Sequence, residues 1–295
     1  MDALDVPAGA VVVGVDGSAR AGRALELATH EAARRGTGLH VVYAFPWLAT
    51  AHGWEFAPEA DALETAGRVV ADAVDRASAM RADLTVTGQV VVDDPAVVLV
   101  EASDRASLVV VVGARGLGPV AGQLLGSVSQ KVAAHARGPV LVVREEAVED
   151  GGPVAVGADP AGETPEVMES AFEEAVRRRT GVRVVLATER ESVPPAYADD
   201  QVLDLLREAT TQTRQRTSAE VRAWAARYPG VPVEEVFVHQ HPVEALVQVA
   251  GRASVVVVGS RGRRGLRGVR LGSVARGVLH RAPLVLVVRV HQERV

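Results

Sequence analysis

The chain repeats itself once, and this duplication constrains its fold more than any other feature of the sequence. The run ASLVVVVGARG at residues 106–116 returns as ASVVVVGSRG at residues 253–262. Gly113 and Gly259 are 146 positions apart, and so are Gly126 and Gly272. A repeat of this length is a whole domain rather than one turn of a solenoid. We expect domains at residues 1–146 and 152–295, joined by an acidic, glycine-containing linker at 145–153.

In each half, valine-rich runs alternate with segments of helical periodicity. The first half has apolar runs typical of strands that are covered on both faces, at 11–15, 40–44, 86–92, 108–112 and 140–143. Helices are expected at 20–35, at 58–81 and from Pro95, with Ser18 and Asp94 as N-caps. The second half repeats this pattern, with helices from Pro165 and at about 199–228. Alternating β and α elements predict two α/β, Rossmann-like domains, each with a parallel sheet between two layers of helices.

Composition excludes several classes of function. The 295 residues carry a formal net charge of −5, whereas general nucleic-acid-binding proteins are normally basic. The absence of cysteine excludes disulfides and thiol catalysis, and it fits a reducing compartment. The apolar runs are too short to cross a bilayer, and Asp2 and Asp5 stand where a signal peptide would be basic. We therefore expect a cytoplasmic protein that binds neither nucleic acid nor a membrane.

A glycine pattern follows the fourth expected strand of each half. It runs Gly113-x2-Gly116-x9-Gly126-Ser127 and then Gly259-x2-Gly262-x9-Gly272-Ser273. Glycines let a backbone approach an anion closely, and the free amides of a helix start attract phosphate. Ser127 and Gln130 have the spacing of a capping box, which predicts a helix start at that serine. Because the loop follows a parallel strand's carboxyl end, we interpret it as a phosphate site rather than as two turns.

The same residues resemble a known family. The pattern Gly-x2-Gly-x9-Gly-Ser, with an aspartate after the first strand, resembles the ATP-binding type of universal stress protein, twice over nearly the whole chain. The resemblance implies a five-stranded sheet of order 3-2-1-4-5 in each domain. It also implies ATP, with or without Mg²⁺, bound with little or no turnover and no catalytic residue. Pairing is implied through the last strands, Val140–Val143 and Val285–Val288, either as a homodimer or between the halves of one chain.

Carried over position by position, the resemblance implies two sets of nucleotide-binding residues. The first half contributes Gly14, Asp16, Val41 (or Val42), Gly113, Ala114, Arg115, Gly116, Gly126, Ser127 and Val128. The second contributes Gly157, Asp159, Val184 (or Val185), Gly259, Ser260, Arg261, Gly262, Gly272, Ser273 and Val274. The aspartates would lie beside ribose and adenine, the second-strand valines would touch adenine, and the loop residues would hold the phosphates.

The two sites are not identical in sequence. The first half has Asp16-Gly17-Ser18, whereas the second has Asp159-Pro160-Ala161, and Arg276 replaces Gln130. The second loop also carries five arginines, either as a solvated surface or as a clamp on the β- or γ-phosphate: Arg261, Arg263, Arg264, Arg267 and Arg270. We therefore expect unequal affinities.

Other residues admit two interpretations each. His239 and His241 have the spacing of a metal pair but are more typical of a surface or N-cap role. Asp93 and Asp94 indicate a turn and cap before Pro95, with Mg²⁺ beside a triphosphate as the alternative. Trp47 and Trp54 either cover a core edge or stack on a base.

Three functions stay open at this point. The first is an ATP-binding regulatory protein, favoured because the chain's one lysine, Lys131, is not placed as in a P-loop. The second is a slow ATPase or a nucleotidyl or phosphoryl transferase that uses the same loop. The third is an interaction scaffold with degenerate pockets. The sequence does not distinguish ATP from ADP or AMP.

Overall fold

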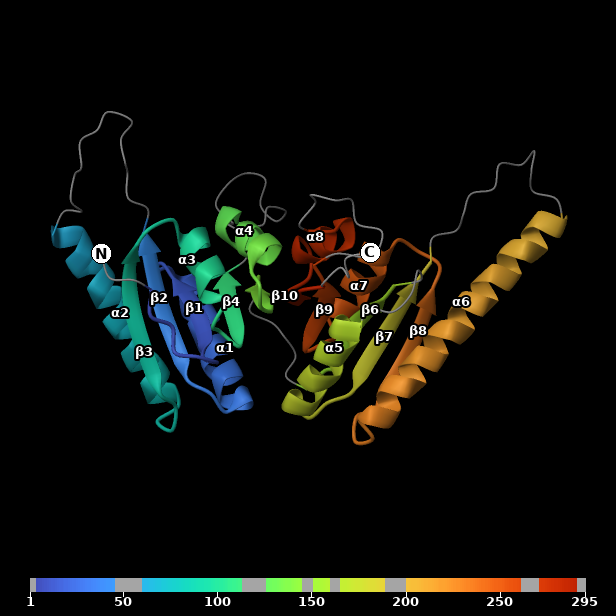
Figure 1. The fold of residues 1–295 in the computed structure, drawn as a ribbon, viewed down its shortest axis with the longest axis horizontal. Coiled ribbons are helices and arrows are strands. Elements are labelled where there is room, and N and C mark those ends of the chain that lie inside the picture. Colours follow the sequence, from blue (N-terminus) through green and yellow to red (C-terminus); the bar gives the residue numbers. More distant parts are fainter. Residues whose placement is uncertain are drawn as a thin grey trace, which may run out of the picture. The chain divides into compact units, whose positions relative to one another are not determined.

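The computed structural model describes residues 4–45, 60–112, 126–144, 151–159, 165–188, 200–260 and 271–290. The chain divides into two compact units, residues 1–146 and 147–295 (Figure 1).

The first unit is a parallel sheet of order β3-β2-β1-β4-β5. Its elements in chain order are β1 (Val11–Val15), α1 (Ala19–Arg35), β2 (Leu39–Phe45), α2 (Ala60–Met80), β3 (Val86–Val92), α3 (Pro95–Ala102), β4 (Leu108–Val112), α4 (Ser127–His135) and β5 (Val140–Val143).

The second unit has the same topology, in the order β8-β7-β6-β9-β10. Its elements are β6 (Val154–Ala158), α5 (Pro165–Arg178), β7 (Val182–Ala187), α6 (Asp200–Arg227), β8 (Val233–Val238), α7 (Pro242–Ala250), β9 (Val255–Gly259), α8 (Ser273–Leu279) and β10 (Leu284–Val288). The expected α/β class, parallel pairing and strand order are confirmed in both units.

The central strand of each sheet is buried on both faces, which explains why it consists of small apolar residues, VVVGV in β1 and VAVGA in β6. Val11, Val12 and Val13 of β1 are 0% exposed. In the first unit, α1 contacts α2 on one face of the sheet, and α3 contacts α4 on the other. Right-handed crossovers require this division, because the chain moves outward from β1 in one direction and later returns in the other.

The helix ends follow the local sequence. The Ser18 Oγ accepts a hydrogen bond from the Ala21 N–H at 3.2 Å and caps α1, as predicted. At the other end of α1, Gly36 adopts a φ of 63°, and its N–H donates to the Ala33 carbonyl at 3.2 Å. A left-handed residue at this position is the usual helix stop, and glycine adopts it without steric cost.

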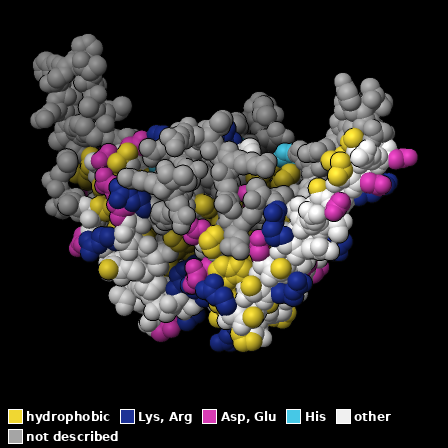
Figure 2. All heavy atoms as spheres, turned by 45° about the vertical axis from the view of Figure 1, so that its right-hand side comes forward, with side chains coloured by type: hydrophobic (Ala, Val, Ile, Leu, Met, Phe, Trp, Pro, Cys, Tyr) yellow, Lys and Arg dark blue, Asp and Glu magenta, His cyan; other side chains and the backbone are white. Residues whose placement is uncertain are grey.

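The surface gives no sign of a single basic face in the view of Figure 2, where acidic and basic side chains are interspersed. Within the described ranges, no helix combines the length and apolarity that crossing a membrane requires.

The contact of α2 with β3 depends on a glycine and yields a prediction. A Cβ at Gly88 would lie 2.5 Å from Val70 Cγ1 and 3.0 Å from Val74 Cγ2. Gly88→Ala should therefore lower the free energy of unfolding by about 1–3 kcal/mol, because α2 must move off the sheet. Urea denaturation measures the change.

Gly67→Ala is the control for the same contact. Gly67 lies in α2, and a Cβ there meets nothing within 4 Å. This substitution should stabilise by about 0.4–1 kcal/mol through the unfolded state. Equal effects of the two substitutions would contradict the packing argument.

Candidate functional site

The candidate site of each unit lies where the sheet order reverses. β1 pairs with β2 on one side and with β4 on the other. The connections that follow β1 and β4 therefore leave toward opposite edges of the sheet, and open α/β sheets bind ligands in the crevice between such connections. Asp16 directly follows β1, and α4 follows β4. In the second unit, β6, Asp159, β9 and α8 have the same positions.

The helices that follow β4 and β9 begin without a side-chain cap. Gly126 is the N-cap of α4, with φ −60° and ψ 147°, and Gly272 is the N-cap of α8, with φ −66° and ψ 159°. In neither helix does a described side chain accept a hydrogen bond from the first amides as a cap. By contrast, the side chains of Ser18, Asp94 and His241 cap α1, α3 and α7. The first amides of α4 and α8 are thus left for another acceptor.

The expected capping box at Ser127 and Gln130 is wrong. Ser127 is the first residue inside α4, one position past the cap, and it is exposed. The carbonyl of Gly126 accepts the Gln130 N–H at 2.9 Å and the Ser129 hydroxyl at 3.0 Å. The predicted helix start at a serine is confirmed for both Ser127 and Ser273.

In the second unit, Ser260 holds the two ends of the glycine loop together. Ser260 is 1% exposed, and its N–H donates to the Val288 carbonyl at 2.7 Å. Its carbonyl accepts the Gly272 N–H at 2.8 Å, and its Oγ accepts the Val290 N–H at 3.4 Å. The start of α8 is thereby fixed directly beyond β9. Ser260 thus has a structural task in addition to the ligand contact predicted for it.

Gly14 and Gly157 have a packing role at the end of the first strand of each unit. A Cβ at Gly14 would lie 2.9 Å from Leu99 Cδ1 of α3, and one at Gly157 would lie 3.2 Å from Leu246 Cδ1 of α7. The glycines therefore let a helix approach the central strand closely. Asp16 beyond Gly14 is exposed, and its Oδ1 accepts the Ser18 N–H at 3.0 Å.

The valines predicted to touch adenine lie in the middle of their strands. Val41 is 0% exposed and pairs with Val13 and Gly88. Val184 and the alternatives Val42 and Val185 are also buried.

The strand register points to other residues at this place. Because Val15 pairs with Tyr43 and Ala158 pairs with Leu186, the residues level with Asp16 and Asp159 are Ala44 and Ala187. The sequence alone does not point to these alanines, since periodicity does not reveal how neighbouring strands align.

The carboxylates before α3 form a cap and a turn, as expected. Asp94 Oδ1 accepts the N–H groups of Ala96 at 2.8 Å and Val97 at 3.3 Å, and Lys131 Nζ of α4 lies 3.5 Å from Asp94 Oδ2. Partial burial opposes the charge, but these amides and Lys131 prevail and lower the pKa of Asp94. Asp93 accepts the Asp94 N–H at 2.6 Å.

Histidines occupy the equivalent place in the second unit. His241 caps α7 by accepting the Val243 N–H at 3.2 Å, which confirms its expected N-cap role, and His239 Nδ1 lies 3.0 Å from Thr188 Oγ1. Across the described ranges, no three His, Asp or Glu side chains gather as a metal site would require. Gly277 replaces Lys131, and a Cβ there would lie 2.6 Å from Val243 Cγ2. The surroundings of the two sites thus differ in charge and in helix spacing.

Several predicted residues lie outside the described residues. These are Gly113, Ala114, Arg115, Gly116, Arg261, Gly262, the other four arginines of the second loop, Trp47 and Trp54.

The fold and the paired helix starts define a class: a tandem, doubly wound α/β protein in which the helix at each switch point begins at a glycine, with no side-chain cap among the described residues. Comparison with known proteins gives the family. The model of the universal stress protein family matches residues 8–144 and again residues 152–289.

Two curated relatives from Mycobacterium tuberculosis match over almost their whole length. Universal stress protein Rv1996 is 35% identical, with 96% of each chain covered. Universal stress protein Rv2005c is 37% identical, with 94% of this chain and 96% of the relative covered. A solved universal stress protein from Archaeoglobus fulgidus shares the fold, with a TM-score of 0.66 at 18% identity over 96% of this chain and 97% of that one. The chain belongs to the universal stress protein family.

The cap at Asp94 predicts a pH-dependent stability. Asp94→Ala should lower the free energy of unfolding at pH 7 by about 0.5–2 kcal/mol, because the Ala96 and Val97 amides lose their acceptor. A carboxyl whose pKa is lowered by folding stabilises above its unfolded pKa of about 3.9, and this contribution disappears as the pH falls through the folded value. Urea denaturation of wild type and variant at pH 7 and at pH 3 measures it. A difference that is equally large at both pH values would contradict this account.

Proposed function

We propose that this universal stress protein binds ATP in both units, as a ligand that biases its conformation or its choice of protein partner. The observation that carries the proposal is the pair of uncapped helix starts at Gly126 and Gly272, each at a switch point of a parallel sheet. Free amides and the helix dipole favour a negative group at that place. The glycine pattern before each helix lets the backbone approach the phosphates.

ATP as a ligand fits the described side chains better than ATP as a substrate. The acidic and imidazole groups near the site already have structural partners: Asp94 and His241 cap helices, and Asp16 accepts the Ser18 amide. In the described ranges, these groups therefore do not stand as a free general base beside the helix starts. A regulatory ligand requires only that the protein's states bind it with different affinity.

The two sites should bind the nucleotide with different affinity. The first unit places Lys131 one turn into α4, where it pairs with Asp94, whereas the second has Gly277 at that position. The second unit instead carries five arginines in its loop sequence. One or two of these arginines would hold the β- or γ-phosphate, with Mg²⁺ as a further counter-charge.

Aspartate at the N-cap tests the phosphate site without threatening the fold. Gly126→Asp and Gly272→Asp each place a carboxylate where the phosphate would sit, and aspartate is itself a favoured N-cap. Each variant should therefore keep or slightly raise its free energy of unfolding while losing one of two ATP equivalents in calorimetric titration. The affinity that remains should differ between the two variants.

Gly67→Asp is the control, because it adds the same charge at an open position of α2. It should bind ATP as wild type does. With ATP at 100 times its dissociation constant, the wild type should gain about 2.7 kcal/mol of stability. Absence of any such gain, or two equivalents of ATP in all variants, would refute the proposal. Multiple turnovers of ATP by the wild type would identify an ATPase instead.

The strand register yields a test of the adenine side. Val41→Ala should lower the free energy of unfolding by about 1–3 kcal/mol, since it removes buried methyl groups, and leave the ATP dissociation constant unchanged. Ala44→Leu should raise that constant in the first unit while costing little stability, because Ala44 is only half-buried at the strand end. Titrations in a Gly272→Asp background isolate the first site. A raised ATP dissociation constant in Val41→Ala, with an unchanged constant in Ala44→Leu, would assign the adenine contact to Val41, as the family resemblance implies.

A further inference from the structure

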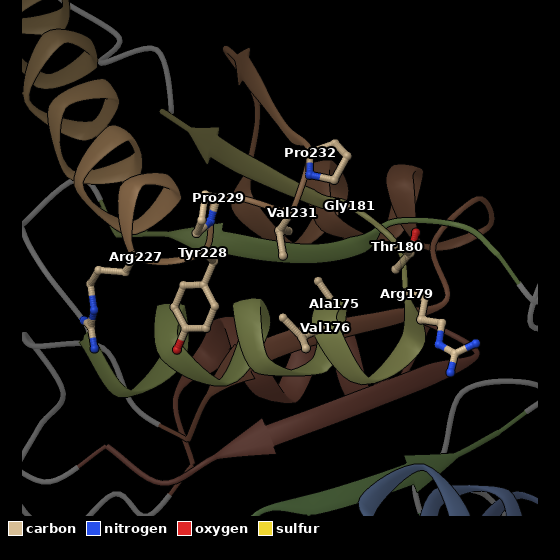
Figure 3. A pocket seen from close by; sticks show the side chains of 11 residues that line it. Ala175, Val176, Arg179, Thr180, Gly181, Arg227, Tyr228, Pro229, Val231 and Pro232 are labelled. Atoms are coloured by element: carbon tan, nitrogen blue, oxygen red, sulfur yellow. The ribbon is translucent and has the colours of Figure 1, made fainter.

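The second unit contains a hollow at the end of the sheet opposite the candidate ATP site. Its volume is about 670 Å³, which lies in the range of small-molecule sites. It is bounded by the last turn of α5, by the residues that follow α6 and by those that lead into β7 and β8. Figure 3 shows Val231 pointing across the hollow toward Ala175 and Val176 of α5.

Tyr228, which lines the hollow, belongs to a cluster of three aromatic rings. The rings of Phe172, Trp224 and Tyr228 stack between α5 and α6, with the centroids of Phe172 and Tyr228 5.2 Å apart. The equivalent residues of the first unit are Thr29, Ala77 and Arg81. Larger side chains between the helices hold them further apart than small ones.

The two units are otherwise built alike at this place. The Leu84 N–H donates to the Arg81 carbonyl at 3.1 Å, and the Val231 N–H donates to the Tyr228 carbonyl at 3.0 Å. The side chains rather than the turn therefore distinguish the second unit.

One residue at the rim of the hollow has an unfavourable backbone. Arg179 has a φ of 54° and is the one non-glycine residue with positive φ in the described part of the chain. It ends α5 as Gly36 ends α1: the N–H groups of Arg179 and Thr180 donate to Val176 and Ala175 at 3.1 and 3.0 Å. The first unit thus shows that glycine fits this position. Such strain persists where the side chain serves a purpose, and it concentrates at ligand sites.

The charged side chains that line the hollow are all positive. Its charged lining residues are Arg179 and Arg227, with no acidic residue among them. Arg227 already has partners: its Nη2 lies 3.3 Å from Glu169 Oε1, and its Cζ lies 4.1 Å from the centroid of the Trp224 ring. Arg179 is exposed and makes no ion pair with any residue the structure describes. Figure 3 places the two guanidinium groups at opposite ends of the hollow.

The floor of the hollow is apolar and open to solvent. Val176 is 53% exposed, which is high for a valine that faces a concave surface, and Val231 and Pro232 lie opposite it. Removing such surface from water favours binding of an apolar body. An apolar body and a terminal anion are therefore the two features that a matching ligand needs.

We propose that this hollow binds a small amphipathic organic anion, with a ring system or short acyl chain against Val176 and Val231 and a sulfonate, carboxylate or phosphate on Arg179. The site is formed by residues of the second unit. It is independent of nucleotide binding, because its residues lie at the amino ends of β7 and β8.

The probe 8-anilinonaphthalene-1-sulfonate tests the proposal, with ATP in excess so that nucleotide sites do not compete for it. Wild type should bind one equivalent saturably, followed by the rise in probe fluorescence. Arg179→Gly should weaken binding about ten- to a hundredfold, as expected for loss of a charged hydrogen-bond partner. The same variant should raise the melting temperature, because glycine adopts this backbone without strain. Lost binding with a raised melting temperature cannot come from unfolding.

Three comparisons make the result specific. Arg207→Ala removes an equal charge from the exposed face of α6 and should bind the probe as wild type does. Val176→Glu should weaken binding by placing a carboxylate on the floor of the hollow. The neutral analogue N-phenyl-1-naphthylamine should bind wild type and Arg179→Gly alike. No saturable binding by wild type, or an equal loss in Arg207→Ala, would overturn the proposal.

Discussion

The reversal of the sheet at its central strand is the constraint on which both candidate sites depend. β1 and β6 each pair with the second and the fourth strand of their unit, and right-handed crossovers then place the first two helices of a unit on one face of the sheet and the last two on the other. The loops after the first and fourth strands must diverge. Leu99 packs directly on Gly14, and Leu246 packs directly on Gly157. This close packing holds a helix against the central strand at the place where the loops diverge.

Because the domain is duplicated, the two units can be compared to see which backbone features they share and which side chains differ. Backbone features recur in both units: the turn that ends the first helix, the glycine N-cap after the fourth strand, and the parallel register. Several side chains around these features differ between the units. Lys131 beside Asp94 is replaced by Gly277 against Val243, and Gly36 by Arg179. A shared framework with different side chains permits the two units to hold different ligands.

The sequence predicted the fold well because the relevant signals are local. Unbroken valine runs located the strands, and Ser18 and Asp94 located helix starts through their own hydrogen bonds. The alignment of neighbouring strands was not predictable in this way, because Ala44 reaches the level of Asp16 only through the register of β1 and β2. The capping box was wrong for another reason: glycine is also an acceptable N-cap, so the spacing of Ser127 and Gln130 did not determine which residue is the N-cap of α4. Glu31 and Glu174 were missed because glutamate is rarely buried, yet each is at most 1% exposed and pairs with arginines of its own helix.

The glycine N-caps of α4 and α8 differ from the other helix starts in a way that the proposed anion site explains. A side-chain cap contributes about 0.5–2 kcal/mol, and the chain uses one at α1, α3 and α7. The same chain has glycine instead at Gly126 and Gly272, at matching positions in both units. Glycine has no side chain that could accept a hydrogen bond from the first amides of these helices. The proposal accounts for glycine at both switch points, because an anion supplied from outside the chain would accept hydrogen bonds from the amides in place of a side chain.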